Sequence, residues 1–238
     1  MRIGKKGKTI VFISVALAIV LAVAYCIFFV FLPAKKQKQQ RLLVEQYYQN
    51  KFALYAKENE EYADYEIDVA FLGDSLTDGY DLNKYYPQYK TANRGIGGET
   101  SFGLEGRMQV SVYDLKPKVA VLLIGGNNLD TMLDNYERLL QGLQTNLPQT
   151  QVVVLSLTAM GGDWARKNAQ AALNNVSIKG LAEKYEYEFV DLFTPLFDIT
   201  IGEVYAGYTT DGAHFTPQGY EIVTAQITPI LEKLLGER

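Results

Sequence analysis

The stretch Ile67-Asp68-Val69-Ala70-Phe71-Leu72-Gly73-Asp74-Ser75-Leu76 decides the fold that we predict. Its first six residues form a short and mostly apolar run, which is typical of a buried strand in a parallel sheet. Gly73, Asp74 and Ser75 follow, and all three residue types favour turns. We therefore expect Ser75 to lie where a buried strand ends and a turn begins, which is a good position for a reactive hydroxyl.

From residue 66 onward, short apolar runs alternate with amphipathic stretches. Strands are predicted at 67–72, 90–93, 119–124, 152–157 and 187–190, and helices at 100–113, 130–144, 165–185 and 218–235. This alternation predicts right-handed βαβ units, which build a parallel sheet with helices on both faces. The expected fold is a three-layer α/β/α domain with a parallel five-stranded sheet. Ligands of such sheets bind beyond the carboxyl ends of the strands.

His214 is the only histidine in the chain, and Asp211 stands three positions before it. Histidine suits a general base near neutral pH because its ordinary pKa is about 6.5. His214 would take the proton of the Ser75 hydroxyl, and Asp211 would bond the other ring nitrogen and fix its tautomer. Taken alone, Asp-x-x-His is more often a capped loop, and Gly-Asp-Ser is more often a turn.

Four short motifs occur in one order along the chain: Gly73-Asp74-Ser75-Leu76, Asn93-Arg94-Gly95-Ile96-Gly97-Gly98-Glu99-Thr100, Gly125-Gly126-Asn127-Asn128 and Asp211-Gly212-Ala213-His214. In these motifs the chain resembles the SGNH or GDSL family of serine esterases and lipases, from about residue 66 to the C-terminus. The resemblance implies a flavodoxin-like hydrolase fold and a catalytic triad of Ser75, Asp211 and His214. It also implies acyl-enzyme chemistry without a metal or a cofactor.

The resemblance further implies three hydrogen-bond donors for the oxyanion of the tetrahedral intermediate. They are the backbone N–H of Ser75, the backbone N–H of a glycine in the second motif, and the side-chain amide of Asn127. The match of the second motif points to Gly98, with Gly95 and Gly97 as alternatives, and a glycine leaves the substrate carbonyl unobstructed. The family usually has an aspartate after the asparagine, whereas this chain has Asn128.

Residues 10–32 contain no charged side chain. A helix of this length is long enough to cross the roughly 30 Å hydrocarbon core of a bilayer. The run ends in bulky residues, which are not typical of a signal-peptide cleavage site. We therefore expect an uncleaved transmembrane signal anchor over 10–32, a short cytoplasmic tail over 1–9, and a catalytic domain outside the cell. Basic residues on both sides of the run leave the orientation open.

Residues 33–65 are polar, and apolar side chains recur among them at helical spacing. We expect a juxtamembrane helical stalk there, or else a solvated spacer, followed by the hydrolase domain over 66–238. That domain carries 13 Lys or Arg and 22 Asp or Glu, a net charge of −9. An acidic domain argues against a nucleic-acid partner. One histidine and one cysteine leave no ordinary zinc cluster.

The expected function is that of a membrane-anchored serine hydrolase of carboxylic esters, with O-acyl groups of cell-surface carbohydrate favoured as substrates. A lipase, lysophospholipase or thioesterase of the same family is the first alternative, and a catalytically silent ligand-binding module is the second. Four tyrosines follow the nucleophile and would either line an acyl pocket or pack in the core: Tyr80, Tyr85, Tyr86 and Tyr89. The acyl chain length, the alcohol portion of the substrate and the oligomeric state stay open.

Overall fold

The computed structural model describes residues 21–236, and the chain divides into two compact units, 1–50 and 51–238. Within the first unit the chain is helical from residue 21 onward, where η1 (Cys26–Phe31) leads into α2 (Leu32–Glu60). The last ten residues of α2 belong to the second unit. That unit therefore begins at Lys51, upstream of the boundary at residue 66 that we expected.

The predicted transmembrane helix over 10–32 is not supported. Among residues 21–236, no helix is both long enough and apolar enough to cross a membrane. The described part of the predicted span, 21–32, continues directly into the polar helix α2. The rest of that span, 10–20, lies outside the described residues. The location of the domain outside the cell stays a prediction.

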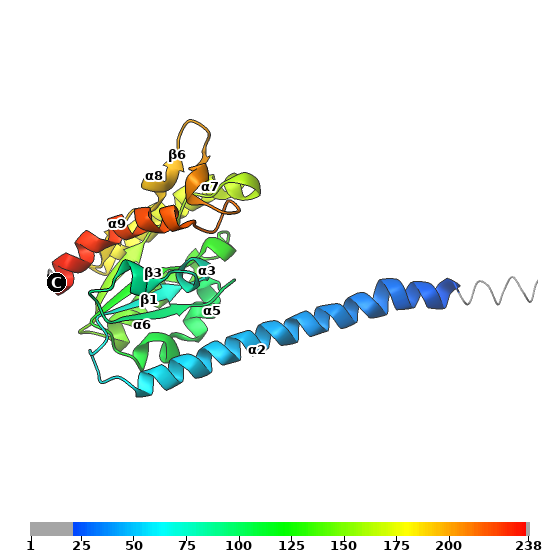
Figure 1. The fold of residues 1–238 in the computed structure, drawn as a ribbon, viewed down its shortest axis with the longest axis horizontal. Coiled ribbons are helices and arrows are strands. Elements are labelled where there is room, and N and C mark those ends of the chain that lie inside the picture. The colour runs from blue at the N-terminus through cyan, green and yellow to red at the C-terminus, as the bar shows by residue number, and fades with distance from the viewer. Residues whose placement is uncertain (1–20, 237–238) are drawn as a thin grey trace, which may run out of the picture. The chain divides into compact units, whose positions relative to one another are not determined.

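The second unit is built around the predicted five-stranded parallel sheet, which is confirmed with the strand order β2-β1-β3-β4-β5 (Figure 1). The strands are β1 (Val69–Gly73), β2 (Thr91–Gly95), β3 (Val119–Leu123), β4 (Gln151–Leu155) and β5 (Glu188–Val190). Gly73 pairs with Gly95 on one side and with Leu123 on the other. The motifs that follow β1, β2 and β3 therefore start side by side at the carboxyl edge of the sheet.

Helices cover both faces of the sheet, so the predicted three-layer arrangement is confirmed as well. One face carries α5 (Ser101–Gly106), η2 (Gln109–Tyr113), α6 (Leu133–Asn146) and α7 (Asn168–Lys184). The other carries α3 (Ser75–Asp78), α4 (Leu82–Tyr85), α8 (Phe193–Leu196) and α9 (Pro217–Leu235). Successive side chains of β1 point to opposite faces of the sheet. Leu72 packs against the helices of the first face and Phe71 against those of the second.

Two details of the chain differ from the predicted elements. The helix expected over 100–113 is divided, because α5 ends at Gly106 before the π-helical turn η2. A small antiparallel hairpin of β6 (Phe197–Asp198) and β7 (Glu203–Val204) lies between α8 and α9. Strands of two residues are too short to show an alternating pattern, so the sequence does not reveal them.

Candidate active site

Ser75 begins α3 directly after β1, at the carboxyl edge of the sheet. Asp74 caps this short helix, because its carboxylate accepts a 3.0 Å hydrogen bond from the backbone N–H of Leu76. At Gly73 a Cβ atom would lie 2.4 Å from the carbonyl oxygen of Leu123. A glycine is therefore required for the close approach of β1 to β3, which places the serine above the central strands.

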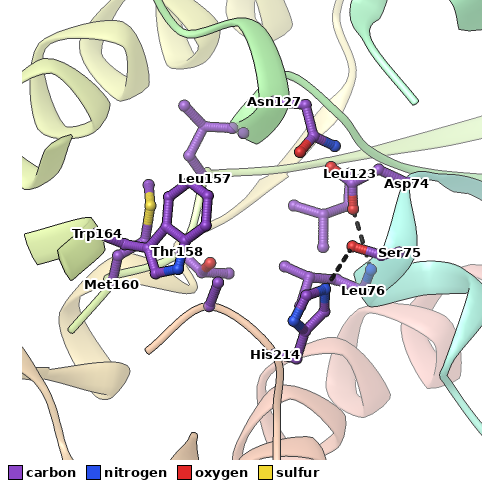
Figure 2. Close-up of a pocket in the computed structure, with 12 residues that line it drawn as sticks. Asp74, Ser75, Leu76, Leu123, Asn127, Leu157, Thr158, Met160, Trp164 and His214 are labelled. Carbon is purple, nitrogen blue, oxygen red and sulfur yellow. Dashed lines mark hydrogen bonds between the residues drawn. The ribbon is translucent and has the colours of Figure 1, made fainter. Parts of the chain in front are cut away.

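His214 lies beside Ser75 although 139 positions separate the two residues in the chain. Its Nε2 atom is 3.0 Å from Ser75 Oγ, and its Nδ1 atom is 2.8 Å from Asp211 Oδ2. Figure 2 shows the histidine on one side of Ser75 and the amide of Asn127 on the other. The fold thus brings Ser75, His214 and Asp211 into one hydrogen-bonded series, which is the arrangement that activates a serine nucleophile.

The Asp211 carboxylate is held ionised by its own loop. It accepts hydrogen bonds from the backbone N–H of His214 at 2.8 Å and of Ala213 at 2.9 Å. The His214 backbone N–H is the largest cause that lowers the pKa of Asp211 to about 2, followed by the His214 side chain. A carboxylate with this pKa stays charged at neutral pH and can stabilise an imidazolium. Both side chains of the pair are about half exposed.

The loop that carries this pair is tied to its neighbours at both ends. Gly212 has φ +89°, and a Cβ atom there would lie 2.1 Å from the Gly161 carbonyl oxygen. Its own carbonyl accepts a 2.8 Å hydrogen bond from the N–H of Gly161. On the other side, the Thr216 hydroxyl caps α9 at Gly219, and Pro217 is the first helical residue, as the sequence predicts.

The predicted oxyanion donors come from the two loops on the other side of Ser75. Gly98 has φ +77°, a conformation that favours glycine, and apart from its two chain neighbours no residue has an atom within 4 Å of where its Cβ would be. Asn127, in η3 (Gly126–Asn128), donates through Nδ2 to the carbonyl oxygen of Glu99 at 2.8 Å. A primary amide has two N–H groups, so the second can donate to a substrate oxygen. The roles of both residues stay predictions.

Gly95 is a poor alternative to Gly98. Its backbone N–H donates to the side-chain oxygen of Asn93 at 2.9 Å. A Cβ atom at Gly95 would lie 2.1 Å from the backbone nitrogen of Asp78. Gly95 therefore allows β2 to pack closely against α3.

Asn128 has its own set of partners, which suit an amide better than the aspartate usual in the family. Its oxygen accepts from the backbone N–H of Ser101 at 3.1 Å, and its Nδ2 donates to the Ser101 hydroxyl at 2.9 Å. That hydroxyl in turn donates to Asn135 at 2.6 Å. A carboxylate at position 128 could accept from the backbone but could not donate to the hydroxyl.

Asp74 is a second carboxyl group at the site, and the sequence analysis assigns it no chemistry. It is almost fully buried, and burial is the main cause that raises its pKa to about 6. The charge of Glu99 raises the pKa further, whereas the backbone N–H of Leu76 and His214 lower it. The site therefore contains one carboxyl group that resists ionisation and one, Asp211, that favours it.

A pocket of about 100 Å³ opens beside Ser75 and His214. Figure 2 shows Leu157, Met160 and Trp164 across the pocket from the serine. No sequence motif indicates this wall, although Trp164, the only tryptophan of the chain, follows the end of β4 by nine residues. Tyr80, Tyr86 and Tyr89 are instead buried in the core, so they pack and do not line this pocket.

Within residues 21–236, no group of three or more His, Cys, Asp or Glu side chains could hold a metal ion. The chemistry that the described groups can perform is proton transfer from a serine hydroxyl to an imidazole, beside a pocket with amide donors. This combination suits nucleophilic attack on an ester carbonyl.

Known proteins share this fold and sequence pattern. The chain is 29% identical to the alpha2 subunit of platelet-activating factor acetylhydrolase IB from Rattus norvegicus over 211 residues, which cover 79% of this chain and 83% of the relative. A GDSL-like lipase from Bacteroides thetaiotaomicron superposes with a TM-score of 0.68 at 25% identity, covering 76% of this chain and 97% of that one.

An acetyl xylan esterase from Geobacillus stearothermophilus also has a similar fold, with a TM-score of 0.58 at 20% identity over 71% of this chain and 95% of that one. The sequence model of the GDSL-like lipase/acylhydrolase family matches residues 71–222. That match covers more than half of the chain and includes the loops after β1, β2 and β3 together with the Asp211–His214 pair. The protein is therefore a serine ester hydrolase that belongs to the GDSL-like lipase/acylhydrolase family.

Proposed function

We propose that the protein removes short acyl groups, of the acetyl type, from O-acylated carbohydrate. In this proposal Ser75 attacks the ester carbonyl while His214 accepts its proton, and Asp211 stabilises the resulting imidazolium. The alcohol leaves after His214 returns the proton to it. Water activated by the same histidine then hydrolyses the acyl-enzyme.

The observation that carries the proposal is the size of the pocket next to Ser75, about 100 Å³. For comparison, an apolar cavity of about 150 Å³ in another protein holds benzene. This volume favours an acyl group of a few heavy atoms over a long fatty chain, most of which would have to lie outside the pocket. Its apolar lining of Leu123, Leu157 and Met160 suits a methyl or ethyl end.

The negative oxygen of the tetrahedral intermediate would be stabilised by the backbone N–H of Ser75, the backbone N–H of Gly98 and the side-chain amide of Asn127. Support comes from the 2.8 Å bond that orients the Asn127 amide and from the open space above Gly98. One donor of this kind contributes roughly 3–4 kcal/mol to transition-state stabilisation.

A second candidate substrate is an acetyl ester of a phospholipid, which shares the short acyl group and differs in the alcohol portion. The name of the rat relative at 29% identity favours this candidate. The small pocket is equally suitable for both substrates, since only the acyl group would enter it. The alcohol portion therefore has to be identified by experiment.

The test is a comparison of kcat/KM for the purified full chain in two series. p-Nitrophenyl esters from acetate to octanoate should show the highest value at two to four carbons and a steep fall beyond them, because longer chains exceed the pocket. Acetylated xylo-oligosaccharides and an acetylated ether phospholipid then separate the two alcohols. A preference for octanoate over acetate would overturn the proposal of a short acyl group.

A further inference from the structure

A buried ion pair lies behind the candidate site, between Glu99 and Arg107. The Arg107 Nε atom is 3.0 Å from Glu99 Oε2, and both side chains are at most 3% exposed. The room for the carboxylate depends on Gly103, because a Cβ there would lie 1.7 Å from Glu99 Oε1. A pair buried this deeply adds little net stability compared with apolar side chains of the same shape, so its geometry calls for an explanation.

The Arg107 guanidinium joins three segments that are separate in the sequence. Its Nη2 donates to the carbonyl oxygen of Gly73 at 3.0 Å, at the end of β1 and just before the nucleophile. Its Nη1 donates to the carbonyl oxygen of Arg94 at 2.9 Å, near the end of β2, and to the Ser111 hydroxyl at 2.8 Å. Only the planar fork of an arginine offers donors in these fixed directions.

Glu99 connects Arg107 to Asn127, one of the predicted oxyanion donors. Its second carboxylate oxygen accepts from the backbone N–H of Thr100 at 3.1 Å, so both ends of the carboxylate are held. Its backbone carbonyl accepts the 2.8 Å bond from Asn127 Nδ2. The position of Glu99 therefore sets the direction of the Asn127 amide, while the same arginine holds the strand end that precedes Ser75.

We propose that Arg107 is a positioning residue for ester hydrolysis, which holds the Asn127 amide and the Ser75 backbone N–H at a fixed separation. The inference rests on the proposed function, because it assumes that these two groups bind the oxyanion. Arg107 is not among the residues that line the pocket, so it acts through Glu99 and Gly73. A small displacement of preorganised donors lowers the rate without weakening substrate binding.

The first test is Arg107→Lys in the full chain, which keeps the positive charge beside Glu99 and removes the fork. We expect kcat for p-nitrophenyl acetate to fall about 10- to 100-fold, with KM changed less than about threefold. The matched control is Arg138→Lys, which removes the fork from an exposed Arg–Glu pair, with Arg138 Nε 2.7 Å from Glu105. The control should keep both constants within twofold.

A double variant separates positioning from general weakening of the fold. Because one of the two routes from Arg107 runs through Asn127, Arg107→Lys combined with Asn127→Ala should lower kcat by clearly less than the product of the two single losses. The part of the Arg107→Lys loss that persists reports the route through Gly73. Independent losses that multiply would overturn the proposal, as would an Arg107→Lys variant with kcat within twofold of the wild type. If Arg107→Lys does not fold, Glu99→Gln decides by the same criteria, since it keeps the shape of the side chain and removes its charge.

The outcomes also separate this inference from the proposed function. Loss of kcat in Asn127→Ala together with an unaffected Arg107→Lys would refute the positioning role alone. An unaffected Asn127→Ala would refute the oxyanion assignment on which the inference rests. The rate at which a fluorophosphonate labels Ser75 provides a second readout that does not depend on the natural substrate.

Discussion

Asp211 and His214 are about half exposed and lie three positions apart on one loop, whereas Glu99 and Arg107 are buried and join segments from three different parts of the chain. The exposed pair forms the proton-transfer half of the candidate site. In the proposed mechanism the buried pair supports the donor half, made of Ser75, Asn127 and the loop between β2 and α5. The two halves meet at the Ser75 hydroxyl.

The difference shows how one site can combine two requirements. Proton transfer needs a histidine that changes its charge during the reaction, and local backbone bonds suffice to hold its carboxylate partner. Oxyanion stabilisation needs donors that do not move when charge develops, so their support lies in the interior, where long-range contacts fix it. Changes to the first half should act mainly on chemistry, whereas changes to the buried residues that support the second should also lower stability.

The largest effect on kcat is expected from changes to Ser75 and His214, whose side chains bond to each other where the two halves meet. Ser75→Ala and His214→Ala should each lower kcat on the order of 10⁴-fold or more, because they remove the nucleophile and the base. The double variant should lose little beyond either single one, since the two residues act as a unit. Steady-state kinetics with an active-site titration measures this, and near-normal turnover by Ser75→Ala would refute the proposed nucleophile.

Removing α2 should damage the donor half through the fold. The Arg94 guanidinium is fully buried and contacts Glu58 and Asn59, and the Tyr55 hydroxyl donates to the Gly95 carbonyl at 2.7 Å. A fragment that starts at residue 66 removes Glu58, Asn59 and Tyr55 from around Arg94, and loss of one partner of a buried ion pair costs about 3–5 kcal/mol.

We therefore expect the 66–238 fragment to unfold at a much lower denaturant concentration than a matched fragment that starts at residue 51. Chemical denaturation followed by circular dichroism compares the two. Equal stability of both fragments would show that 51–65 contributes nothing to the hydrolase fold.

The adjacent amides Asn127 and Asn128 should differ in the kind of damage that they cause. Asn127→Ala should lower kcat roughly 10²- to 10³-fold with little change in KM, because its bond to the substrate strengthens in the transition state. Asn128→Ala and Asn128→Asp should lower the melting temperature more than kcat, since both lose the donor to the Ser101 hydroxyl. Kinetics and thermal unfolding are measured on the same preparations, and a reversed pattern would contradict these assignments.

The smallest expected effect concerns the two carboxyl groups of the site. Asp74 has an ordinary pKa of 3.8 in the unfolded chain and about 6 in the folded protein. Between these values the folded state keeps a proton that the unfolded chain releases, so stability falls as the pH rises from about 4 to about 6. Over this pH range the free energy of unfolding should fall on the order of 2–3 kcal/mol in the wild type, and Asp74→Asn should abolish that fall.

Asp211 should behave in the opposite way. The pKa of Asp211 is lowered to about 2 in the folded protein. Its ionised carboxylate therefore contributes to folding stability above about pH 4, and this contribution is lost as the pH falls towards 2. That contribution is small because the side chain is about half exposed. Urea titrations of the wild type, Asp74→Asn and Asp211→Asn at pH 4.5 and 7.5 compare the two groups. An unchanged pH dependence in Asp74→Asn would show that burial does not raise this pKa.

The amino-acid sequence alone was sufficient for the sheet and the family, and it singled out Asp211 and His214, whose side chains lie within hydrogen-bond distance. Apolar runs report burial directly, so strands such as β1, β3 and β4 could be predicted from them. The strand β2 has the mostly polar sequence TANRG, and only the alternation of elements around it indicates a strand there. Asp211 and His214 lie within one turn of chain, and their bond follows from local geometry. The predicted transmembrane helix over 10–32 is not supported, because no helix among residues 21–236 is both long enough and apolar enough to cross a membrane.

Only the tertiary structure decided which distant residues meet. The Glu99–Arg107 pair, the contact of Tyr55 with Gly95 and the pocket wall from Leu157 to Trp164 all join segments that no local pattern connects. A sequence pattern reports which face of an element is buried, because burial depends on the residue itself. The partner of a buried charge depends instead on how strands and helices are ordered around the sheet, and that order emerges only when the whole chain packs.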